Sequence, residues 1–374
     1  MKYIWQHNAW PNLTYDEGAF RIPVERVLSK AGELAGMQLG LSNDEQFTAS
    51  VNELTDETIH SFAIEGEKLN PKLMRDSLIA SLTTRDREQA AGAYSRVADM
   101  MIDARNTEQT MTLERLNHWH QQLFQNDRFL NDIGQLRTNK EPMQVVTTKR
   151  GEVAEIHYEA PPSSRIPQEM SNLLGWIEST QSAESLQTPV RAALVHLRFE
   201  TIHPYSDGNG RIGRALSDYI IAQNPILSRA PFSLSKIIQS NKNAYYDALQ
   251  LAQSNNVITA SGEIDVTPFV AWFIETMDQA IDESAHLARH INQRNRFFEH
   301  FQGQLNERQL KALQDLFERG PSRLQEGLSS RRYRRSTDAS RQTATRDLKN
   351  LVEKGALLPA TGLGPSTHYL VNLL

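Results

Sequence analysis

Within twelve positions, residues 203–214 combine the groups that chemistry on phosphate esters requires. The stretch reads His203-Pro204-Tyr205-Ser206-Asp207-Gly208-Asn209-Gly210-Arg211-Ile212-Gly213-Arg214. Because histidine titrates near neutral pH, His203 suits a general base that takes the proton of a hydroxyl nucleophile. The carboxylate of Asp207 offers oxygen ligands of the kind that magnesium prefers. These residue types therefore predict a phosphoryl- or nucleotidyl-transfer site.

The glycines and arginines of the same stretch predict an anion-binding turn at the start of a helix. The Gly-Asn-Gly run at 208–210 lets backbone N–H groups converge on an anion with no Cβ in the way. A helix expected over 210–223 would point its partially positive N-terminus at that anion. Arg211 and Arg214 share one face of this helix and can neutralise phosphate oxygens. Each residue alone is more often structural, but together they indicate a complete site.

This stretch resembles the signature of the Fic family, H-x-F-x-[DE]-G-N-G-R-x-x-R, except that Tyr205 replaces the usual Phe. The resemblance implies a mainly α fold: a Fic-type helical bundle core with a β-hairpin flap. It also implies transfer of AMP from ATP to a Ser, Thr or Tyr hydroxyl of a target protein, with Mg2+ as cofactor. By this resemblance His203 would deprotonate the hydroxyl and Asp207 would bind the magnesium ion.

The resemblance also implies a set of nucleotide-binding residues. The backbone of 208–210 would cradle the α- and β-phosphates, Arg211 would also hold them, and Arg214 would hold the γ-phosphate. Farther along, residues 241–249 resemble the family's helix on the adenine side, although paired tyrosines on a helix are also typical of a core. The implied set is Asp207, Gly208, Asn209, Gly210, Arg211, Ile212, Gly213, Arg214, Tyr245, Tyr246 and Gln253.

A β-hairpin is predicted at 143–160, upstream of the motif. Two runs rich in β-branched residues flank the turn-forming residues 149–152, and Pro161-Pro162 ends the second run. By the resemblance this hairpin is the flap, which adds a strand to the target protein. A plain surface hairpin is the alternative. The flap residues expected to bind the target are Val145, Val146, Ile156 and His157.

Residues Ser61 to Gly66 match the family's inhibitory motif, [ST]-x-x-x-E-[GN]. Judged by chemistry alone, this is the end of an amphipathic helix with a glutamate where the helix dipole disfavours negative charge. An arginine is the obvious compensating group, and a solvated surface glutamate is the alternative. The resemblance implies that Glu65 pairs with Arg214 and fills the place of the γ-phosphate. In some relatives this glutamate also helps to remove AMP, so the resemblance is compatible with addition of AMP alone and with both addition and removal.

A winged helix-turn-helix domain is predicted at 300–374. A capping-box pattern opens a first helix that ends near Phe317, and a second short helix is expected at about 322–330. A third helix is expected over 340–354, followed by a two-stranded wing with a turn at 361–364.

This C-terminal region is locally basic. Between Ser322 and Asn350, eight Lys and Arg face three acidic residues, whereas the whole chain has a net charge of −5. Arg341, Gln342 and Thr345 lie on the expected recognition helix and could face a DNA groove. The alternative is a protein-binding or dimerising role, which winged helices also have.

The helical periodicity and the motifs divide the chain into three predicted parts. Residues 1–95 form an N-terminal helical region whose inhibitory helix lies at about 55–66. Residues 96–290 form the Fic catalytic core, and residues 300–374 form the winged-helix domain. Before residue 300, helices are predicted at about 20–40, 44–64, 85–104, 112–125, 166–180, 189–200, 210–223, 242–255 and 266–300.

Length and composition fit a globular protein of several domains. The chain has 374 residues, 39% of them hydrophobic, and it has no cysteine, which excludes disulfides and thiolate metal sites. No apolar run approaches the ~20 residues of a membrane span, and the N-terminus lacks the apolar core of a signal peptide. We therefore expect a cytoplasmic protein without a membrane partner, and a homodimer is one expected assembly.

Taken together, the sequence predicts a self-inhibited protein adenylyltransferase that modifies a target protein and itself. A nucleotide-sensing winged-helix transcriptional regulator is one alternative, and a Fic transferase with another donor is a second. The intact His203, Arg211 and Arg214 favour the enzyme. The identity of the target is not encoded, because contacts with a flap are mostly made by the backbone.

Overall fold

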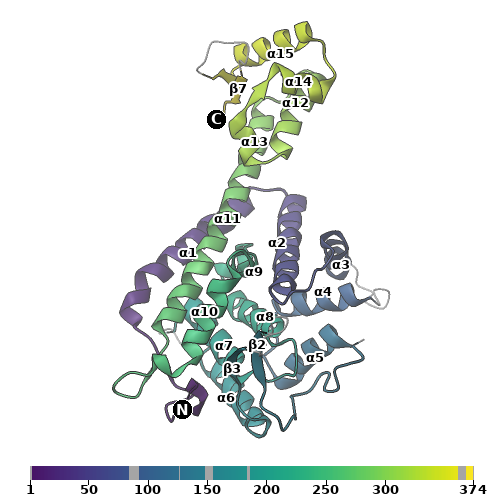
Figure 1. Cartoon of the computed structure of the whole chain (residues 1–374). Helices are drawn as coiled ribbons and strands as arrows, with labels where there is room; N and C mark the ends of the chain where they lie inside the picture. The colour runs from purple at the N-terminus through teal and green to yellow at the C-terminus, as the bar shows by residue number, and fades with distance from the viewer. Residues whose placement is uncertain are drawn as a thin grey trace. The chain divides into compact units, whose positions relative to one another are not determined.

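The computed structural model describes residues 2–83, 92–125, 127–147, 155–182, 186–360 and 368–373. The predicted flap turn at 149–152 and the predicted wing turn at 361–364 lie outside the described residues. The chain forms two compact units, unit 1 (Met1–Ser284) and unit 2 (Ala285–Leu374). Both are mainly helical, which confirms the predicted fold class (Figure 1).

Unit 1 contains most of the helices. Its elements are η1 (Ile4–Gln6), β1 (Leu13–Thr14), α1 (Glu17–Leu39), α2 (Asn43–Ile64), α3 (Pro71–Thr83), α4 (Ala93–Asp103), α5 (Leu113–Phe124), β2 (Gln144–Thr147), β3 (Glu155–Glu159), η3 (Ser163–Arg165), α6 (Ile166–Ser179), α7 (Thr188–Ile202), α8 (Asn209–Ala222), η4 (Leu227–Arg229), α9 (Leu234–Ser240), α10 (Lys242–Gln253), η5 (Asn255–Val257) and β4 (Ile264–Asp265). The helix α11 (Thr267–His300) begins in unit 1 and ends in unit 2.

The antiparallel pair α7 and α8 forms the centre of unit 1. Every residue of α7 from Pro189 to Ile202 is buried, because α6, α8 and α10 pack around it. Figure 1 shows α7 and α8 inside the unit, and α2 and α5 both contact α8. Residues 203–208, the first half of the 203–214 motif, join α7 to α8, and the second half forms the start of α8, so the loop is anchored at both ends by buried helices.

The helix α2 is longer than the predicted inhibitory segment and has a well-formed start. Ser42 caps it: its hydroxyl accepts from the N–H of Glu45 (3.3 Å), and the carboxylate of Glu45 accepts from the N–H of Ser42 (3.1 Å). The helix ends at Ile64, and Gly66 follows with a left-handed φ of 86°. Packing against α3, α8 and α9 carries the end of α2 to the loop between α7 and α8.

Three features of unit 1 differ from the sequence prediction. The sequence reasoning did not predict α3, which has 13 residues, or α9, which has only seven. The predicted helix at 85–104 is α4, which begins at Ala93; residues 84–91 lie outside the described part of the chain. β1 and β4 form a parallel pair about 250 residues apart in the sequence (Leu13 with Ile264), which no local pattern could reveal.

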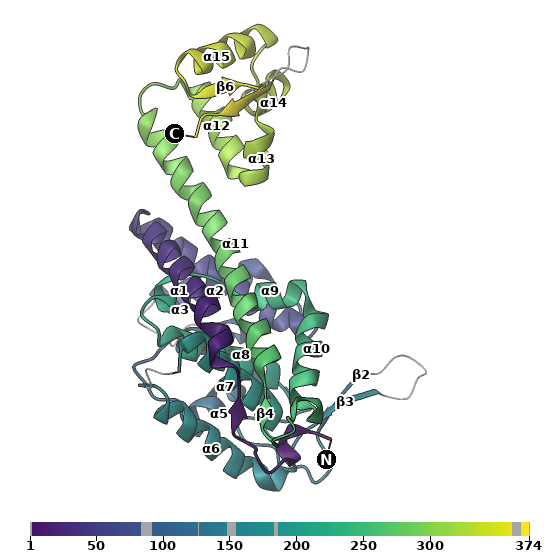
Figure 2. The same cartoon turned by 90° about the vertical axis from the view of Figure 1, so that its left-hand side faces the viewer.

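The hairpin of β2 and β3 is antiparallel and has an irregular register between Val145 and Val146. Tyr158, on β3, is buried, and its hydroxyl donates to the carbonyl of Thr201 on α7 (2.5 Å). Figure 2 shows the two strands beside the end of α10, and β3 contacts α10. The hairpin is thus tied to the central helices at its base.

Unit 2 has its own core, made of Phe297, Leu313, Phe317, Tyr333, Leu348 and Leu357 among others. Its elements after α11 are α12 (Glu307–Glu318), α13 (Pro321–Glu326), β5 (Leu328–Ser329), α14 (Ser330–Thr337), α15 (Arg341–Glu353), β6 (Leu357–Pro359) and β7 (His368–Val371). The short helix predicted at about 322–330 is α13, but it ends earlier, because Gly327, at a φ of 68°, follows its last residue and a separate helix begins at Ser330. The predicted two-stranded wing is part of a three-stranded sheet in the order β5-β7-β6. The winged-helix assignment stays a prediction.

In the described part of the chain, no helix combines the length and the apolar character needed to cross a membrane.

Candidate active site

The loop between α7 and α8 is a tight turn. The helix α7 ends one residue before His203, whose left-handed φ of 52° turns the chain away from the helix axis. The side chain of Asn209 closes the loop: it accepts from the N–H of Tyr205 (2.9 Å) and donates to the carbonyl of Tyr205 (2.8 Å). Gly208 has a φ of 77°, and a Cβ there would lie 2.6 Å from the ring of Phe124. Backbone geometry therefore requires glycine at this position.

Tyr205, which stands where the motif has Phe, is buried beneath the loop. Its ring stacks on His120 with centroids 4.4 Å apart, and its hydroxyl donates to Oδ1 of Asn117 (3.0 Å). Because the hydroxyl has a partner, the tyrosine fits with no unsatisfied polar group.

His203 is held from both sides. Its Nδ1 lies 3.3 Å from the carbonyl oxygen of Glu200, while Nε of Arg137 donates to the carbonyl of His203 (2.8 Å). A proton on Nδ1 would be donated to the Glu200 carbonyl, which leaves Nε2 as the basic nitrogen. Burial lowers the pKa of His203 to about 4, so the imidazole is neutral at physiological pH. A neutral imidazole can accept a proton, as a general base must.

The end of α2 binds Arg214 through Nη2 and Nε, while the buried Nη1 of Arg214 has no hydrogen-bond partner among the described residues. Its Nη2 donates to Oε1 of Glu65 and to the carbonyl of Ser61, both at 2.8 Å, and its Nε donates to the hydroxyl of Ser61 at 2.9 Å. The guanidinium is buried, and the carboxylate is about two-thirds buried. Burial alone would raise the pKa of Glu65, but the charge and hydrogen bond of Arg214 outweigh it and lower that pKa.

The carboxylate of Glu65 lies directly over the first turn of α8. A Cβ at Gly210 would collide with Oε1 of Glu65 and would approach Nη1 of Arg214. The glutamate therefore occupies the place where a helix N-terminus and an arginine together attract an anion.

Arg211 lies beside this ion pair and makes a second acidic contact with the chain after α2. Its Nη1 lies 2.6 Å from Oε1 of Glu67, and its Nη2 lies 3.3 Å from Oδ1 of Asp207. The guanidinium also stacks between the rings of Phe62 and Phe124, at 5.2 and 4.9 Å from their centroids. Both arginines of the motif thus hold carboxylates supplied by the segment 65–67.

A cavity of about 700 Å³ opens beside the loop. The residues that line it come from the loop, from β2 and β3, and from α10; His203, Asp207, Gly208, Asn209, Gly210, Glu65, Val145, Val146, His157, Tyr245, Tyr246 and Gln253 are among them. Its size is within the range of small-molecule sites. Twelve of the residues singled out in the sequence therefore meet around one space.

The description "Fic/DOC family" matches residues 110–221, a range that contains α5, the hairpin and the whole motif loop. Residues 110–221 are a Fic domain. A second family, described as a domain of unknown function (DUF4172), matches residues 3–83.

Among curated proteins, the Fic domain is similar to "Protein adenylyltransferase Fic" of Culex quinquefasciatus, with 36% identity over 114 residues. It is also similar to the protein of that name from Aedes aegypti, with 33% identity over 114 residues. Each match covers 30% of this chain and 19% of the relative. The chain thus spans less than a fifth of the length of these relatives.

Among solved structures, a Fic domain containing signaling protein from Bacteroides thetaiotaomicron has a similar fold, with a TM-score of 0.52. The likeness covers 71% of this chain and 97% of that chain, at 18% identity. At this identity the likeness concerns the fold alone.

The residues expected on the adenine side differ in how they face the cavity. Tyr245 is buried, and its hydroxyl is hydrogen-bonded to Nε2 of His196 (3.0 Å). Tyr246 is 37% exposed, and Gln253 reaches Oγ1 of Thr201 at 3.5 Å. Tyr246 is therefore the more accessible of the two tyrosines, with the ammonium of Lys242 over its ring at 5.5 Å, whereas Tyr245 is a buried part of the cavity wall.

Some expected site residues do not face the cavity of the Fic domain. Ile212 is completely buried, and Gly213 lies against Glu200, with which a Cβ would collide. Both support the packing of α8 on α7. Ile156 does not line the cavity either and is 42% exposed.

Residues to which the sequence analysis gave no role in the site also line the cavity: Glu200, Lys242, Asn243, Asp247 and Gln250. All but Glu200 belong to α10, and their spacing along that helix is the signal that could have found them. Glu200 had no such signal, because a glutamate inside an apolar helix is recognisable as unusual only once its burial is known.

No cluster of three or more His, Cys, Asp or Glu that could hold a metal occurs among the described residues. Asp207 nevertheless fits a magnesium ion that is bound mainly by substrate phosphates. Its side chain is 62% exposed and lines the cavity next to the glycine turn. Magnesium commonly uses one or two carboxylates together with phosphate oxygens and water.

Proposed function

We propose that this protein is a self-inhibited protein adenylyltransferase, which transfers AMP from ATP to a Ser, Thr or Tyr hydroxyl of a target protein and of itself. The proposal rests on one observation above all: a neutral, anchored His203 lies beside a glycine turn whose arginine is occupied by Glu65. The similarity of the Fic domain to proteins named protein adenylyltransferase supports the reaction class.

In the proposed reaction, Nε2 of His203 takes the proton of the target hydroxyl. The hydroxyl oxygen then forms a bond to the α-phosphorus of ATP while the bond from that phosphorus to pyrophosphate breaks. The N–H groups at the start of α8 would hold the phosphates, and the cavity wall of α10 would hold the adenosine. Asp207 would hold a magnesium ion, which neutralises charge on the phosphates when bound.

The flap would present the target. Val145 and Val146 line the cavity from β2, and His157 lines it from β3. A two-stranded hairpin has free backbone groups at its outer edge, and an extended segment of another protein can pair there. The target hydroxyl would then lie near His203.

The segment 61–67 would act as the inhibitor. Glu65 fills the anion position above Gly210 and uses Nη2 of Arg214, so a γ-phosphate would have to displace it. Activation therefore needs the end of α2 to withdraw or Glu65 to turn away. The same carboxylate could position water for the removal of AMP, which is the reverse activity.

Labelled ATP and purified variants test this function. We expect Glu65→Gly to raise self-adenylylation at least about tenfold, because the Glu65 carboxylate no longer competes with the γ-phosphate of ATP. A tenfold change corresponds to ~1.4 kcal/mol. His203→Ala should abolish labelling in both the wild-type and the Glu65→Gly background, because no base remains. Incorporation of label from α-phosphate-labelled ATP, followed by peptide mass spectrometry, measures both effects.

Lys68→Gly is the matched control, since it introduces a glycine at an exposed position of the same segment and should leave labelling unchanged. No gain for Glu65→Gly would contradict the inhibitory role, and activity in His203→Ala would contradict the role of the base. A product mass other than that of AMP would indicate another donor. ATP binding without any transfer would favour the nucleotide-sensing regulator.

A further inference from the structure

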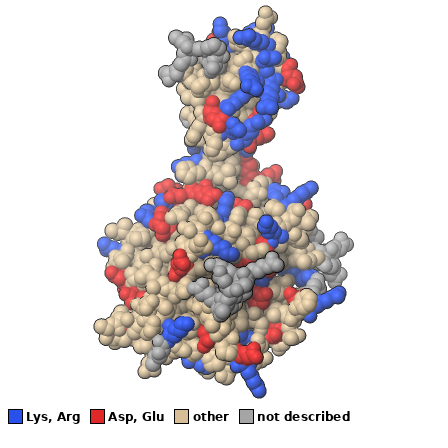
Figure 3. Space-filling view, in the orientation of Figure 1, with Lys and Arg blue, Asp and Glu red and all other residues tan. Residues whose placement is uncertain are grey.

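The two units carry opposite net charge. Unit 2 has fifteen Lys and Arg and eight Asp and Glu, a net charge of +7, whereas the whole chain has −5. Unit 1 therefore carries −12. Figure 3 shows Lys and Arg side chains gathered on one face of unit 2. A compact unit with such an excess attracts a polyanion.

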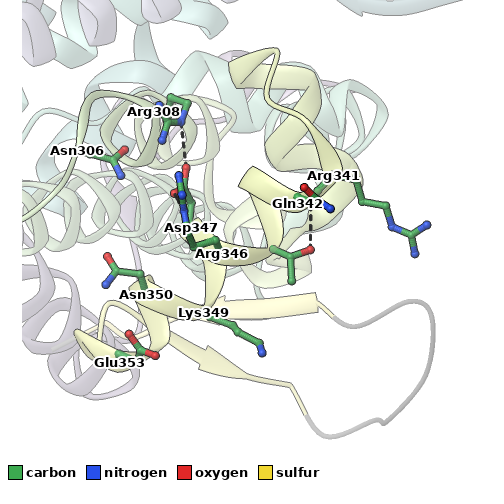
Figure 4. A pocket seen from close by; sticks show the side chains of 10 residues that line it. Asn306, Arg308, Arg341, Gln342, Arg346, Asp347, Lys349, Asn350 and Glu353 are labelled. Carbon is green, nitrogen blue, oxygen red and sulfur yellow. Dashed lines mark hydrogen bonds and ion pairs between the residues drawn. The ribbon is translucent and has the colours of Figure 1, made fainter.

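Part of the excess positive charge of unit 2 lies along one face of the helix α15. The buried face of α15 consists of Ala344, Asp347, Leu348 and Leu351. Its other face presents exposed polar and basic side chains over two turns: Arg341, Gln342, Thr345, Arg346 and Lys349. In Figure 4, Arg341 and Lys349 extend away from the body of the unit.

The helix before it forms a compact two-helix element with α15. Only three residues separate α14 from α15, and the first of them, Asp338, has a left-handed φ of 54°. Ser340 then caps α15, since its hydroxyl accepts from the N–H of Thr343 (3.2 Å). Arg331, Arg334 and Arg335 add exposed positive charge on α14.

Asp347, the acidic residue within this stretch of α15, does not neutralise the positive charge on the exposed face of the helix. Asp347 points into unit 2, where it accepts from Nε of Arg308 (3.0 Å) and from the hydroxyl of Tyr333 (2.9 Å). Arg346 lies 3.9 Å from the same carboxylate but has a side chain that is 75% exposed. Figure 4 shows the contact between Arg308 and Asp347 at the base of the hollow that α12 and α15 line.

We propose that the exposed face of α15 binds double-stranded DNA, with the helix in the major groove. Arg341, Arg346 and Lys349 would contact phosphates, and Gln342 would reach base edges with its amide. A B-form major groove admits an α-helix, whereas the deep, narrow major groove of A-form RNA does not.

The chemistry of the surface favours a nucleic acid over an acidic protein. Large exposed apolar side chains, which anchor protein interfaces, are absent from the exposed face of α15, whose members are Arg, Gln, Thr and Lys. Positive charge together with the amide of Gln342 beside Arg341 fits phosphates flanking base edges.

Fluorescence anisotropy of the full-length protein with a labelled random-sequence DNA duplex of about 30 base pairs tests the proposal. We expect binding that weakens steeply between about 50 and 200 mM salt. The triple variant Arg341→Ala, Arg346→Ala and Lys349→Ala should bind at least about tenfold more weakly, with a salt slope lower by about 2 to 3. Circular dichroism would verify that the variant keeps its helices.

The matched control removes the same charge from exposed positions of unit 1 (Arg21→Ala, Lys72→Ala and Arg128→Ala) and should leave DNA affinity unchanged. The proposal would be overturned by a lack of DNA binding at about 50 mM salt, by equal affinity of the α15 variant and the control, or by stronger binding of a double-stranded RNA of equal length. Binding only to acidic polypeptides such as polyglutamate would also overturn it. None of these results depends on adenylyltransferase activity.

Discussion

At the scale of single residues, two glutamates near the motif loop have opposite ionisation properties. Glu65 has a lowered pKa because Arg214 overcomes the effect of its burial. Glu200 is buried on α7, its Oε1 has no hydrogen-bond partner within the described structure, and burial raises its pKa to about 8. Its Oε2 lies 3.9 Å from Nδ1 of His203. The same type of side chain is thus ionised at position 65 and neutral at position 200.

The raised pKa of Glu200 predicts a pH-dependent stability. Folded Glu200, with a pKa of about 8, keeps its proton up to about pH 8, whereas the unfolded chain releases this proton near the ordinary glutamate pKa of 4.5. Stability from this group is therefore complete below pH 4.5 and is lost as pH rises through 8. We expect Glu200→Gln to gain about 2 kcal/mol or more in unfolding free energy relative to the wild type between pH 5 and pH 8. Urea denaturation at the two pH values measures this.

Glu25→Gln, an exposed substitution on α1, is the control and should follow the wild type at both pH values. A Glu200→Gln difference that is the same at pH 5 and pH 8 would mean that Glu200 is already ionised in the folded protein.

At the scale of elements, α2 connects a helix cap to the active-site loop. Its capping box at Ser42 lies 22 residues before Ile64, so the first turn is far from the ion pair of Glu65. The far end is positioned by packing on α3, α8 and α9 rather than by the cap. A change at the cap should therefore affect stability without disturbing the ion pair of Glu65 and Arg214.

We expect Ser42→Ala to lower the unfolding free energy by about 1 kcal/mol, because the N–H of Glu45 loses its acceptor. Self-adenylylation of the folded protein should stay as low as in the wild type. Thermal denaturation and the labelling assay measure the two effects. Ser50→Ala, at an exposed mid-helix position, is the control and should cause no loss of stability. A rise in labelling for Ser42→Ala would show that the cap and the inhibitory end are coupled.

At the scale of the whole molecule, the chain has two compact units with separate cores. Leu348 is 1% exposed and lies in the unit 2 core with Phe317 and Tyr333. The cavity and the motif loop lie entirely within unit 1. Damage to the core of unit 2 should therefore spare the nucleotide site.

We expect Leu348→Ala to destabilise unit 2 by about 2–5 kcal/mol through loss of buried contacts and a cavity. Limited proteolysis should then cut unit 2 at a lower temperature. When Leu348→Ala is combined with Glu65→Gly, the self-adenylylation expected of Glu65→Gly should persist. Leu358→Ala, whose leucine is 48% exposed, should have a much smaller effect. Simultaneous loss of activity and of unit 2 would show that the units fold as one.

The sequence by itself determined what depends on neighbouring residues. Amphipathic periodicity predicted the long helices, and Gly208 predicted the turn, because periodicity and a left-handed φ are local properties. The order of residues in the motif gave the chemistry of the loop. The sequence reasoning missed α3, and it missed the short helices α9 and α14, whose patterns become helices mainly through packing.

Only the tertiary structure decided which groups meet. Glu65 and Arg214 are 149 residues apart, and their pairing entered the sequence reasoning by family resemblance rather than from any local pattern. The neutral state of Glu200 and the division between cavity-lining Gly210 and buried Gly213 likewise follow from packing. The physical reason is that burial and long-range contact, which set ionisation and access, arise only when distant helices pack together.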